Sequence, residues 1–416
     1  MKTVVLDDDP TGTQSASNVE VLFTSTGELI ADSLRRADSV YVQTNSRSMS
    51  EAAAVALARS IRDHIAQASE LLNEPVQIVL RGDSTLRGHV FAETAVFEDD
   101  SSVMVFVPAF PAGGRTTVDG VHRVDMDGVA VPAAETEYAD DPVFPFTSSR
   151  LTDYVSEKSG RTGVAVALED LRSGRFAALL SSTPAGSVVV PDAVNGEDIR
   201  LIAAGIRAAA DTGVRVVVRC AAPLAAELAG VVSPGLLSAP LLTESVPVLV
   251  VCGSHTSGAT AQLAHLEKAG FSADFVDTDA ALSDPQTEGP RVACVASSAL
   301  ASRDVAVIAS ERERRDDHNT LDHGERVMAS LVSAVQSLLP KVGLVISKGG
   351  ITSAEIAANG VGAHSAFVLG QVMPGVSVWR LRDRADRELL YVIVPGNVGG
   401  PSTITDALVA AVGPKG

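Results

Sequence analysis

The stretch KTVVLDDDPTGT, residues 2–13, joins a short apolar run to three aspartates and then to a turn that contains proline and glycine. Its apolar residues follow one another without alternating with polar ones, which is typical of strands that are covered on both faces of a parallel sheet. The same unit recurs along the chain. The other runs are SVYVQTNSR (39–47), VQIVLRGDS (76–84), SVMVFVPAF (102–110), GVAVALED (163–170), SVVVPDA (187–193), RVVVRCAA (215–222), VPVLVVCGS (246–254), RVACVAS (291–297), VGLVISKGG (342–350), VSVWRL (376–381) and LLYVIVPGN (389–397).

Helical stretches separate many of these runs, as they do in proteins built from strand–helix–strand units. The expected helices lie at 50–72, 195–212, 256–270, 323–339 and 353–359. The sequence therefore predicts an α/β fold with two domains, each an open and mostly parallel sheet with helices on both faces. The segment GVVSPGLLSAPLLTESVP (230–247) carries three prolines and is the expected boundary between domains 1–238 and 239–416.

The composition limits the classes of protein to which the chain can belong. Hydrophobic residues make up 46% of the 416 residues and charged residues 20%, so a sizeable core is available and disorder is not expected. The formal net charge of −18 argues against a nucleic-acid partner, because the phosphate backbone would be repelled. The N-terminal stretch is not a secretory signal, and the apolar runs are too short to span a membrane. We therefore expect a cytoplasmic protein without a membrane partner.

In open α/β sheets, ligands bind at the carboxyl ends of the strands, so the residues after each apolar run are the candidates for chemistry. Asp8 or Asp9 could accept a proton from a substrate hydroxyl or hold Mg²⁺, whereas the alternative is a solvated loop that caps a helix. Arginines after the next strands could bind a carboxylate through paired hydrogen bonds, although a single arginine is more often a surface residue. Their recurrence at successive strand ends favours a site made by Arg47, Arg81, Arg87 and Arg115.

The second half of the chain offers glycine-rich turns between strands and helices. Such turns direct backbone N–H groups and the positive end of a helix dipole at an anion, which makes phosphate the natural ligand. Glycine in one such turn often serves only a tight bend, whereas three turns in one domain favour a nucleotide site. None of them matches the P-loop pattern or the dinucleotide fingerprint. The turns are CGSHTSGAT (252–260), SKGGITSAE (347–355) and PGNVGGPST (395–403).

Five motifs stand in order in the first half: DDDPTGT (7–13), TNSRS (44–48), RGDSTLRGH (81–89), PAFPAGGRTTVDGVHRV (108–124) and DPVFPFTSS (141–149). Together they resemble the N-terminal substrate domain of the four-carbon acid sugar kinase family, which acts on threonate, erythronate and 3-oxo-tetronate. The three glycine-rich turns are similar to the nucleotide-binding turns of that family's C-terminal domain. The resemblance extends over nearly the whole chain.

This resemblance implies ATP-dependent phosphorylation of a hydroxyl on a small sugar acid, with Mg²⁺ accompanying the ATP. We expect Asp9, or as second choice Asp83, to accept the hydroxyl proton, while no metal-binding residue is assigned. The expected substrate contacts, which include the arginines identified above, are Asp8, Arg47, Arg81, Ser84, Arg87 and Arg115. The expected nucleotide contacts are Ser254, Gly349, Gly350, Ile351, Thr352 and Gly396, together with Lys348 if its side chain faces the turn.

The chain also departs from the common pattern of that family. Ile351 stands where an acidic residue is common, and Val398 and Ser402 are further departures, in the third turn. The departures at Ile351 and Ser402 favour a rival function, that of a non-catalytic sensor of a sugar acid and a nucleotide, whereas the retained aspartates and arginines favour an enzyme. A different α/β enzyme, such as a lyase or reductase, is a second rival, and the missing dinucleotide fingerprint counts against a reductase. The particular sugar acid and the oligomeric state stay open, with a homo-oligomer among the alternatives.

Overall fold

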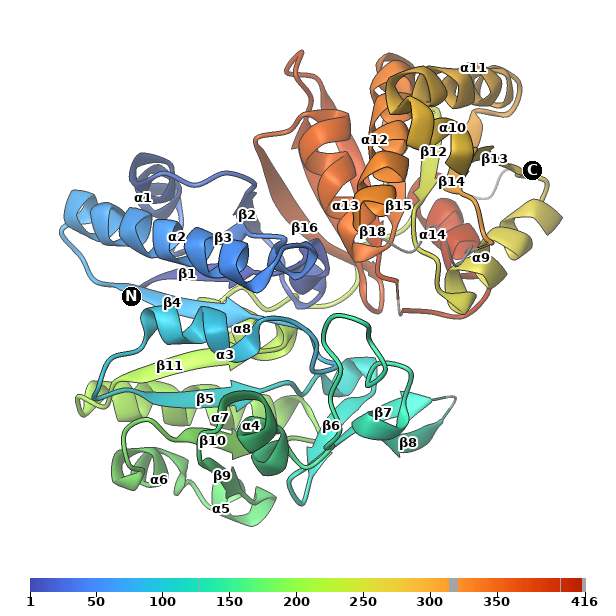
Figure 1. Ribbon diagram of the computed structural model, residues 1–416. Helices are drawn as coiled ribbons and strands as arrows, with labels where there is room; N and C mark the ends of the chain where they lie inside the picture. The colour runs from blue at the N-terminus through green and yellow to red at the C-terminus, as the bar shows by residue number, and fades with distance from the viewer. Residues whose placement is uncertain (127, 314–320, 397, 414–416) are drawn as a thin grey trace. The chain divides into compact units, whose positions relative to one another are not determined.

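The computed structural model of the chain describes residues 1–126, 128–313, 321–396 and 398–413. Two compact units divide the chain, an N-terminal unit at Met1–Val232 and a C-terminal unit at Ser233–Gly416 (Figure 1). Among the described residues, no helix combines the length and the apolar character needed to cross a membrane.

The N-terminal unit contains a parallel sheet with helices against both of its faces (Figure 1). Because every strand pair in it is parallel, the carboxyl ends of the strands lie along one edge. The strand order is β2 (Val19–Leu22), β3 (Ser39–Gln43), β1 (Lys2–Asp7), β4 (Val76–Arg81), β11 (Val216–Cys220), β5 (Val103–Val107), β10 (Val188–Pro191) and β9 (Gly163–Val166).

The helices of this unit begin and end at capping residues, as α2 illustrates. The Ser50 hydroxyl accepts a hydrogen bond from the Ala53 N–H at 3.3 Å, and Asn73 ends the helix in the left-handed conformation. Its buried alanines and isoleucines recur every three or four residues, so one face of α2 packs on the sheet. The helices are α1 (Gly27–Arg36), α2 (Glu51–Leu72), α3 (Val90–Thr94), α4 (Leu151–Ser159), α5 (Leu168–Arg172), α6 (Phe176–Ser182), α7 (Gly196–Asp211) and α8 (Ala222–Ala229).

A second, antiparallel sheet of the N-terminal unit consists of β6 (Arg115–Val118), β7 (Val121–Met126) and β8 (Val129–Pro132). Asp119 and Gly120 form the turn between β6 and β7, and both have positive φ (52° and 73°), as a two-residue hairpin turn requires. The Asp192 carboxylate fixes this turn by accepting hydrogen bonds from both N–H groups at 2.9 Å. Alternate residues of β6 and β7 are buried, so one face of the small sheet is covered.

The C-terminal unit contains a mixed sheet whose first five strands are parallel and whose last two are antiparallel. Their order is β13 (Ala273–Val276), β14 (Val305–Ser310), β12 (Val248–Cys252), β15 (Leu344–Lys348), β18 (Glu388–Val394), β17 (Val376–Arg382) and β16 (Ser365–Met373). The helices are α9 (Ser257–Lys268), α10 (Thr278–Ser283), α11 (Pro285–Arg303), α12 (Leu321–Leu338), α13 (Gly350–Glu355) and α14 (Thr403–Val412). The predicted α/β class with mostly parallel sheets is confirmed.

One predicted strand is wrong. The run RVACVAS (291–297) lies inside α11, because its buried residues recur at helical spacing. Val292 and Ala296 are buried, whereas Val295 between them is 49% exposed. The strand of this region is β14, which follows the helix.

Packing of α1 against α2 yields a stability prediction. Leu34 is fully buried in the core that the two helices share with the sheet, whereas Leu29 on the same helix is 42% exposed. We expect Leu34→Ala to lower the free energy of unfolding by about 2–5 kcal/mol, because it leaves a cavity. Leu29→Ala should change it by about 0.5 kcal/mol or less. Urea denaturation followed by circular dichroism measures both, and equal losses would contradict this packing.

Candidate functional site

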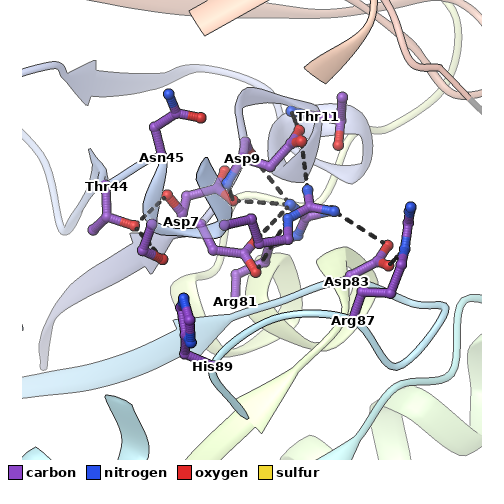
Figure 2. Close-up of polar contacts among 12 residues, drawn as sticks. Asp7, Asp9, Thr11, Thr44, Asn45, Arg81, Asp83, Arg87 and His89 are labelled. Atoms are coloured by element: carbon purple, nitrogen blue, oxygen red, sulfur yellow. Dashed lines mark hydrogen bonds and ion pairs between the residues drawn. The ribbon is translucent and has the colours of Figure 1, made fainter. Parts of the chain in front are cut away.

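Acidic and basic side chains gather at the carboxyl ends of four strands in the N-terminal unit (Figure 2). β1 ends at Asp7 and is followed by two more aspartates, and β4 ends at Arg81. Arg47 lies in the short turn of 3-10 helix after β3, and Arg219 is the last but one residue of β11. Because β3, β1, β4 and β11 are consecutive neighbours in the sheet, strand pairing brings these side chains together.

Arg47 contacts three carboxylates. Its Nη2 lies 2.5 Å from Asp9 Oδ2, its Nε lies 3.5 Å from Asp8 Oδ2, and its Nη1 lies 3.7 Å from Asp83 Oδ1. Burial alone would lower the pKa of the Arg47 guanidinium, but the three carboxylates outweigh burial and raise it. Arg47 therefore stays charged and holds together acids from two different strand ends.

Arg81 is buried more deeply than Arg47, and its ion pairs are with the aspartates at the end of β1. Its Nη1 donates to Asp7 Oδ1 at 3.1 Å, to Asp8 Oδ1 at 3.3 Å and to the Asp9 carbonyl at 3.1 Å. Only 2% of the Arg81 side chain is exposed. The tripeptide Arg81-Gly82-Asp83 is thus an internal part of this site and not an accessible loop.

Arg219 is a member of the network that the sequence motifs did not identify. Its Nη2 donates to Asp8 Oδ2 at 3.1 Å and its Nη1 to Glu93 Oε2 at 2.9 Å, and all three side chains are buried. Gly82 permits this approach, since a Cβ there would lie 2.6 Å from Arg219 Nε. The one signal in the sequence is an arginine near the end of an otherwise apolar strand.

Asp83 lies between Arg47 and a second arginine, Arg87. Arg87 Nε donates to Asp83 Oδ2 at 2.8 Å, and the Thr85 hydroxyl donates to the same oxygen. Burial opposes ionisation of Asp83, but the two arginines and these hydrogen bonds hold its pKa far below its usual range. The guanidinium of Arg87 also lies over the ring of Tyr138, 5.1 Å from its centroid. Asp83 is therefore a firmly ionised and fully engaged carboxylate.

The three consecutive aspartates after β1 differ in acidity. Burial raises the pKa of Asp7 to about 7, and its Oδ2 has no hydrogen-bond partner among the described residues. Burial also raises the pKa of Asp8, against the charges of three arginines. Asp9 is buried too, but neighbouring arginines and hydrogen bonds from Thr11 outweigh burial and lower its pKa. Asp9 is therefore ionised at neutral pH, whereas Asp7 titrates close to it.

Ser84 and Arg115 lie outside these ion pairs. The Ser84 carbonyl accepts a hydrogen bond from His122 Nε2 at 2.8 Å, while its hydroxyl makes no hydrogen bond with the described residues. Arg115 donates from Nη1 to the Gly113 carbonyl and forms no ion pair with any acid in the described part of the chain. The structure thus joins six of the expected residues in one network, namely Asp8, Asp9, Arg47, Arg81, Asp83 and Arg87.

In the C-terminal unit, hydroxyl groups link the first and third glycine-rich turns. Thr256 caps α9, since its Oγ1 accepts from the Ala259 N–H at 3.2 Å, and the same hydroxyl lies 3.2 Å from the Gly396 carbonyl. Ser254 Oγ lies 3.2 Å from Thr256 Oγ1. The hydroxyls of Ser254 and Thr256 therefore lie together at the beginning of α9, where the helix dipole favours an anion.

The first and second turns also approach each other closely. Gly349 has a φ of +111° and precedes α13, a conformation that favours glycine. A Cβ on Gly253 would lie 2.4 Å from Thr352 Oγ1, so glycine is required there as well. Gly350 and Ile351 begin α13, and Ile351 is 48% exposed. The expected nucleotide residues therefore gather around the starts of two helices.

Lys348 is fully buried at the end of β15 and does not face an acid. Its Nζ donates to the Pro395 carbonyl at 2.6 Å and to the Val398 carbonyl at 3.4 Å. Burial lowers the pKa of its ammonium group to about 8. Lys348 thus connects the second turn to the third by holding the carbonyls of Pro395 and Val398.

The described residues contain no group of three or more His, Cys, Asp or Glu side chains that could hold a metal ion. The acids of the N-terminal unit are paired with arginines, and the turns of the C-terminal unit offer hydroxyls and N–H groups. Mg²⁺ fits such a protein when it arrives with a nucleotide, because Mg²⁺ keeps several waters and takes its other ligands from phosphate oxygens.

Comparison with known proteins agrees with these two sites. Residues 3–228 match the family model of a sugar-binding N-terminal domain, and residues 249–404 match that of a nucleotide-binding C-terminal domain. The chain belongs to the family that these two domains define. The resemblance to sugar-acid kinases that the motifs carry is therefore confirmed.

The relatives include two enzymes with curated names. The chain is 28% identical to a D-threonate kinase of Salmonella typhimurium over 98% of both chains. It is 32% identical to a D-threonate kinase of Bordetella bronchiseptica over 58% of this chain and 55% of that protein.

Solved structures confirm the fold. A Salmonella typhimurium LT2 protein has a TM-score of 0.67 at 20% identity over 98% of both chains. A Haemophilus influenzae protein has a TM-score of 0.64 at 17% identity over 97% of this chain and 99% of its own.

The titration of Asp7 yields a pH prediction. A carboxyl group whose pKa is raised by folding stabilises the folded state below its unfolded pKa, and this contribution is lost as pH rises through its folded value of about 7. Between pH 5 and pH 8, the free energy of unfolding of the wild type should fall by about 2.5 kcal/mol relative to that of Asp7→Asn. Urea denaturation of both proteins at the two pH values measures this difference. Parallel pH profiles would show that Asp7 keeps an ordinary pKa.

The position of Lys348 yields a prediction on nucleotide affinity. We expect Lys348→Met to weaken ADP binding about tenfold, because it leaves two carbonyls of the third turn without their donor. Lys341→Met, which changes an exposed lysine next to the amino end of the same strand, is the matched control and should bind ADP like the wild type. Calorimetric titration with ADP measures both. Unchanged affinity in Lys348→Met would separate this lysine from nucleotide binding.

Proposed function

We propose that the protein is an ATP-dependent kinase that phosphorylates a hydroxyl of a small, four-carbon sugar acid of the D-threonate type. The observation that carries this proposal is the pairing of two sites in one family member. The sugar-binding domain has a preformed network of aspartates and arginines at its strand ends, and the nucleotide-binding domain has three linked glycine-rich turns. The curated names of two relatives support the same activity.

ATP would supply the phosphoryl group, with Mg²⁺ neutralising charge on its phosphate oxygens. The chain's part is to hold the phosphates by the hydroxyls of Ser254 and Thr256 and by backbone N–H groups at the starts of α9 and α13. Gly349, Gly350 and Thr352 belong to the second of these helix starts. Gly396 would approach from the third turn, which Lys348 fixes by its two hydrogen bonds.

We infer that Asp9 accepts the proton of the reacting hydroxyl. Its Oδ1 accepts from the Thr11 N–H at 2.7 Å and its Oδ2 contacts Arg47, so the carboxylate is ionised and fixed in direction. A low pKa makes Asp9 a weak base, but phosphoryl transfer through a loose transition state depends mainly on positioning, as in the aspartate of protein kinases. Asp83 is the second choice, because hydrogen bonds from Thr85 and Arg87 engage it more completely.

The other network residues would orient the sugar acid. The Ser84 hydroxyl, which makes no hydrogen bond with the described residues, could donate to a substrate oxygen. Arg47 and Arg87 present N–H groups beside the aspartates, and Gly88 lets the chain pass close to them. A Cβ on Gly88, whose φ is +117°, would lie 3.3 Å from Asp8 Oδ2.

A non-catalytic sensor of sugar acid and nucleotide is the alternative that one observation favours. Ile351 is 48% exposed at the start of α13, where an apolar side chain cannot assist a phosphate or a metal ion. Against this alternative, a sensor has no need of a fixed and ionised carboxylate such as Asp9.

A screen of four- to six-carbon sugar acids for ADP formation from ATP tests the proposal. We expect turnover with a four-carbon acid and none with the corresponding alditols. Saturable binding of a sugar acid without turnover would establish the sensor instead. Turnover only with longer acids would keep the kinase and overturn the four-carbon substrate.

The role of Asp9 yields a prediction within this assay. We expect Asp9→Asn to lower kcat at least about 100-fold, because the amide cannot accept the proton. The KM for ATP should stay near its wild-type value. Asp63→Asn alters an exposed aspartate on α2 and serves as the control. If Asp9→Asn keeps kcat within about threefold of wild type, another group accepts the proton.

A further inference from the structure

The arginines of the network are already matched by the protein's own acids. Four guanidinium groups, those of Arg47, Arg81, Arg87 and Arg219, face six carboxylates among the described residues, namely those of Asp7, Asp8, Asp9, Asp83, Glu93 and Asp141. A substrate carboxylate placed among them would be a seventh. Like charges at short range in a buried site repel strongly, so the network is unsuited to bind a further carboxylate.

The same network suits hydroxyl groups. Ionised carboxylates accept hydrogen bonds from alcohols, and the arginine N–H groups donate to alcohol oxygens, so both kinds of side chain can engage a polyol chain. A sugar acid carries several hydroxyls and one carboxylate. The two parts of such a ligand therefore need different environments.

Arg115 offers the environment that the carboxylate needs. It is 8% exposed, and in the described part of the chain no acid forms an ion pair with it. Its Nη1 donates to the Gly113 carbonyl, and its Nε is buried without a hydrogen-bond partner. A buried guanidinium without a counter-charge is unfavourable until an anion binds beside it.

The register of the small antiparallel sheet places Arg115 on the same face as His122, which contacts the turn after β4. Arg115 pairs with Val124, and Thr117 pairs with His122. All four side chains belong to the buried face of this sheet. His122 Nε2 in turn lies 2.8 Å from the Ser84 carbonyl, which directly follows Asp83. The covered face of the small sheet therefore contacts the Asp83–Ser84 turn.

His122 does not add a charge at this place. Because a carbonyl can only accept, His122 Nε2 is the protonated nitrogen, and Nδ1 accepts from the Thr117 hydroxyl at 3.1 Å. Burial and the charge of Arg115 lower the pKa of His122 to about 4, so the ring is uncharged at neutral pH. Arg115 is thus the cation on the buried face of β6 and β7.

We propose that Arg115 binds the carboxylate of the sugar acid, while the aspartate–arginine network binds its hydroxyls. This inference rests on the proposed sugar-acid substrate and adds the residue that selects an acid over the neutral alditol. Ser84 lies between the two parts, where its hydroxyl can reach either the carboxylate or the neighbouring hydroxyl of the ligand.

Titration calorimetry with D-threonate and with threitol tests whether Arg115 binds the carboxylate and the network binds the hydroxyls. We expect the wild type to bind D-threonate at least about tenfold more tightly than threitol, as one added charged hydrogen-bonding pair provides. Arg115→Gln should lose this preference and keep the wild-type affinity for threitol. Arg115→Lys keeps the positive charge but lacks the planar guanidinium that binds a carboxylate through two hydrogen bonds. Its preference for D-threonate over threitol should lie between those of the wild type and Arg115→Gln.

Arg123→Gln is the matched control, since Arg123 lies on the opposite face of the same hairpin, where it donates to the Ala130 carbonyl. Thermal unfolding verifies that each variant is folded. A wild-type preference for D-threonate in folded Arg115→Gln overturns the inference, as does an equal loss of both ligands. If the wild type binds neither ligand, the proposed four-carbon substrate is overturned, and the inference with it.

Discussion

Arg47 holds three carboxylates at distances of 2.5 to 3.7 Å, and the polar side of the N-terminal unit depends on these contacts. Without Arg47, Asp9 would lose its ion pair, and Asp8 and Asp83 would keep only their contacts with other arginines. Buried ion pairs of this kind add little net stability, because desolvation offsets their attraction. The arrangement is better explained as a prepared polar surface, in which the direction of each carboxylate is fixed before a ligand arrives.

Much of this arrangement follows from the sequence. Uninterrupted apolar runs predicted the parallel strands, and the rule that ligands bind at carboxyl ends pointed to Asp9, Arg47 and Asp83, which strand pairing brings into one network. The sequence did not predict Arg219 as a member of the site, because no motif surrounds it. Only the pairing of β11 with β4 places it beside Asp8. The run RVACVAS was wrongly predicted as a strand, because the periodicity of a short apolar stretch does not distinguish a strand from a helix.

Lys348 shows a second limit of sequence reasoning. A lysine before two glycines resembles a phosphate ligand, yet its ammonium donates to carbonyls 47 and 50 residues further along the chain. No local pattern reveals such a contact, since it depends on β18 lying beside β15. The glycines themselves were easier to interpret, because their need for close approach and positive φ at Gly253 and Gly349 is a property of the backbone.

Asp7 offers one way in which the network, with two more carboxylates than arginines, can lower its negative charge. Burial raises its pKa to about 7, and its Oδ2 has no partner among the described residues that would oppose protonation. When Asp7 is protonated, the network carries one negative charge fewer beside its four guanidinium groups. An anionic ligand at Arg115 then meets a less negative network. A nearby anion disfavours the ionised form of Asp7, and protonation of Asp7 removes a charge that would repel the anion, so the two events favour each other.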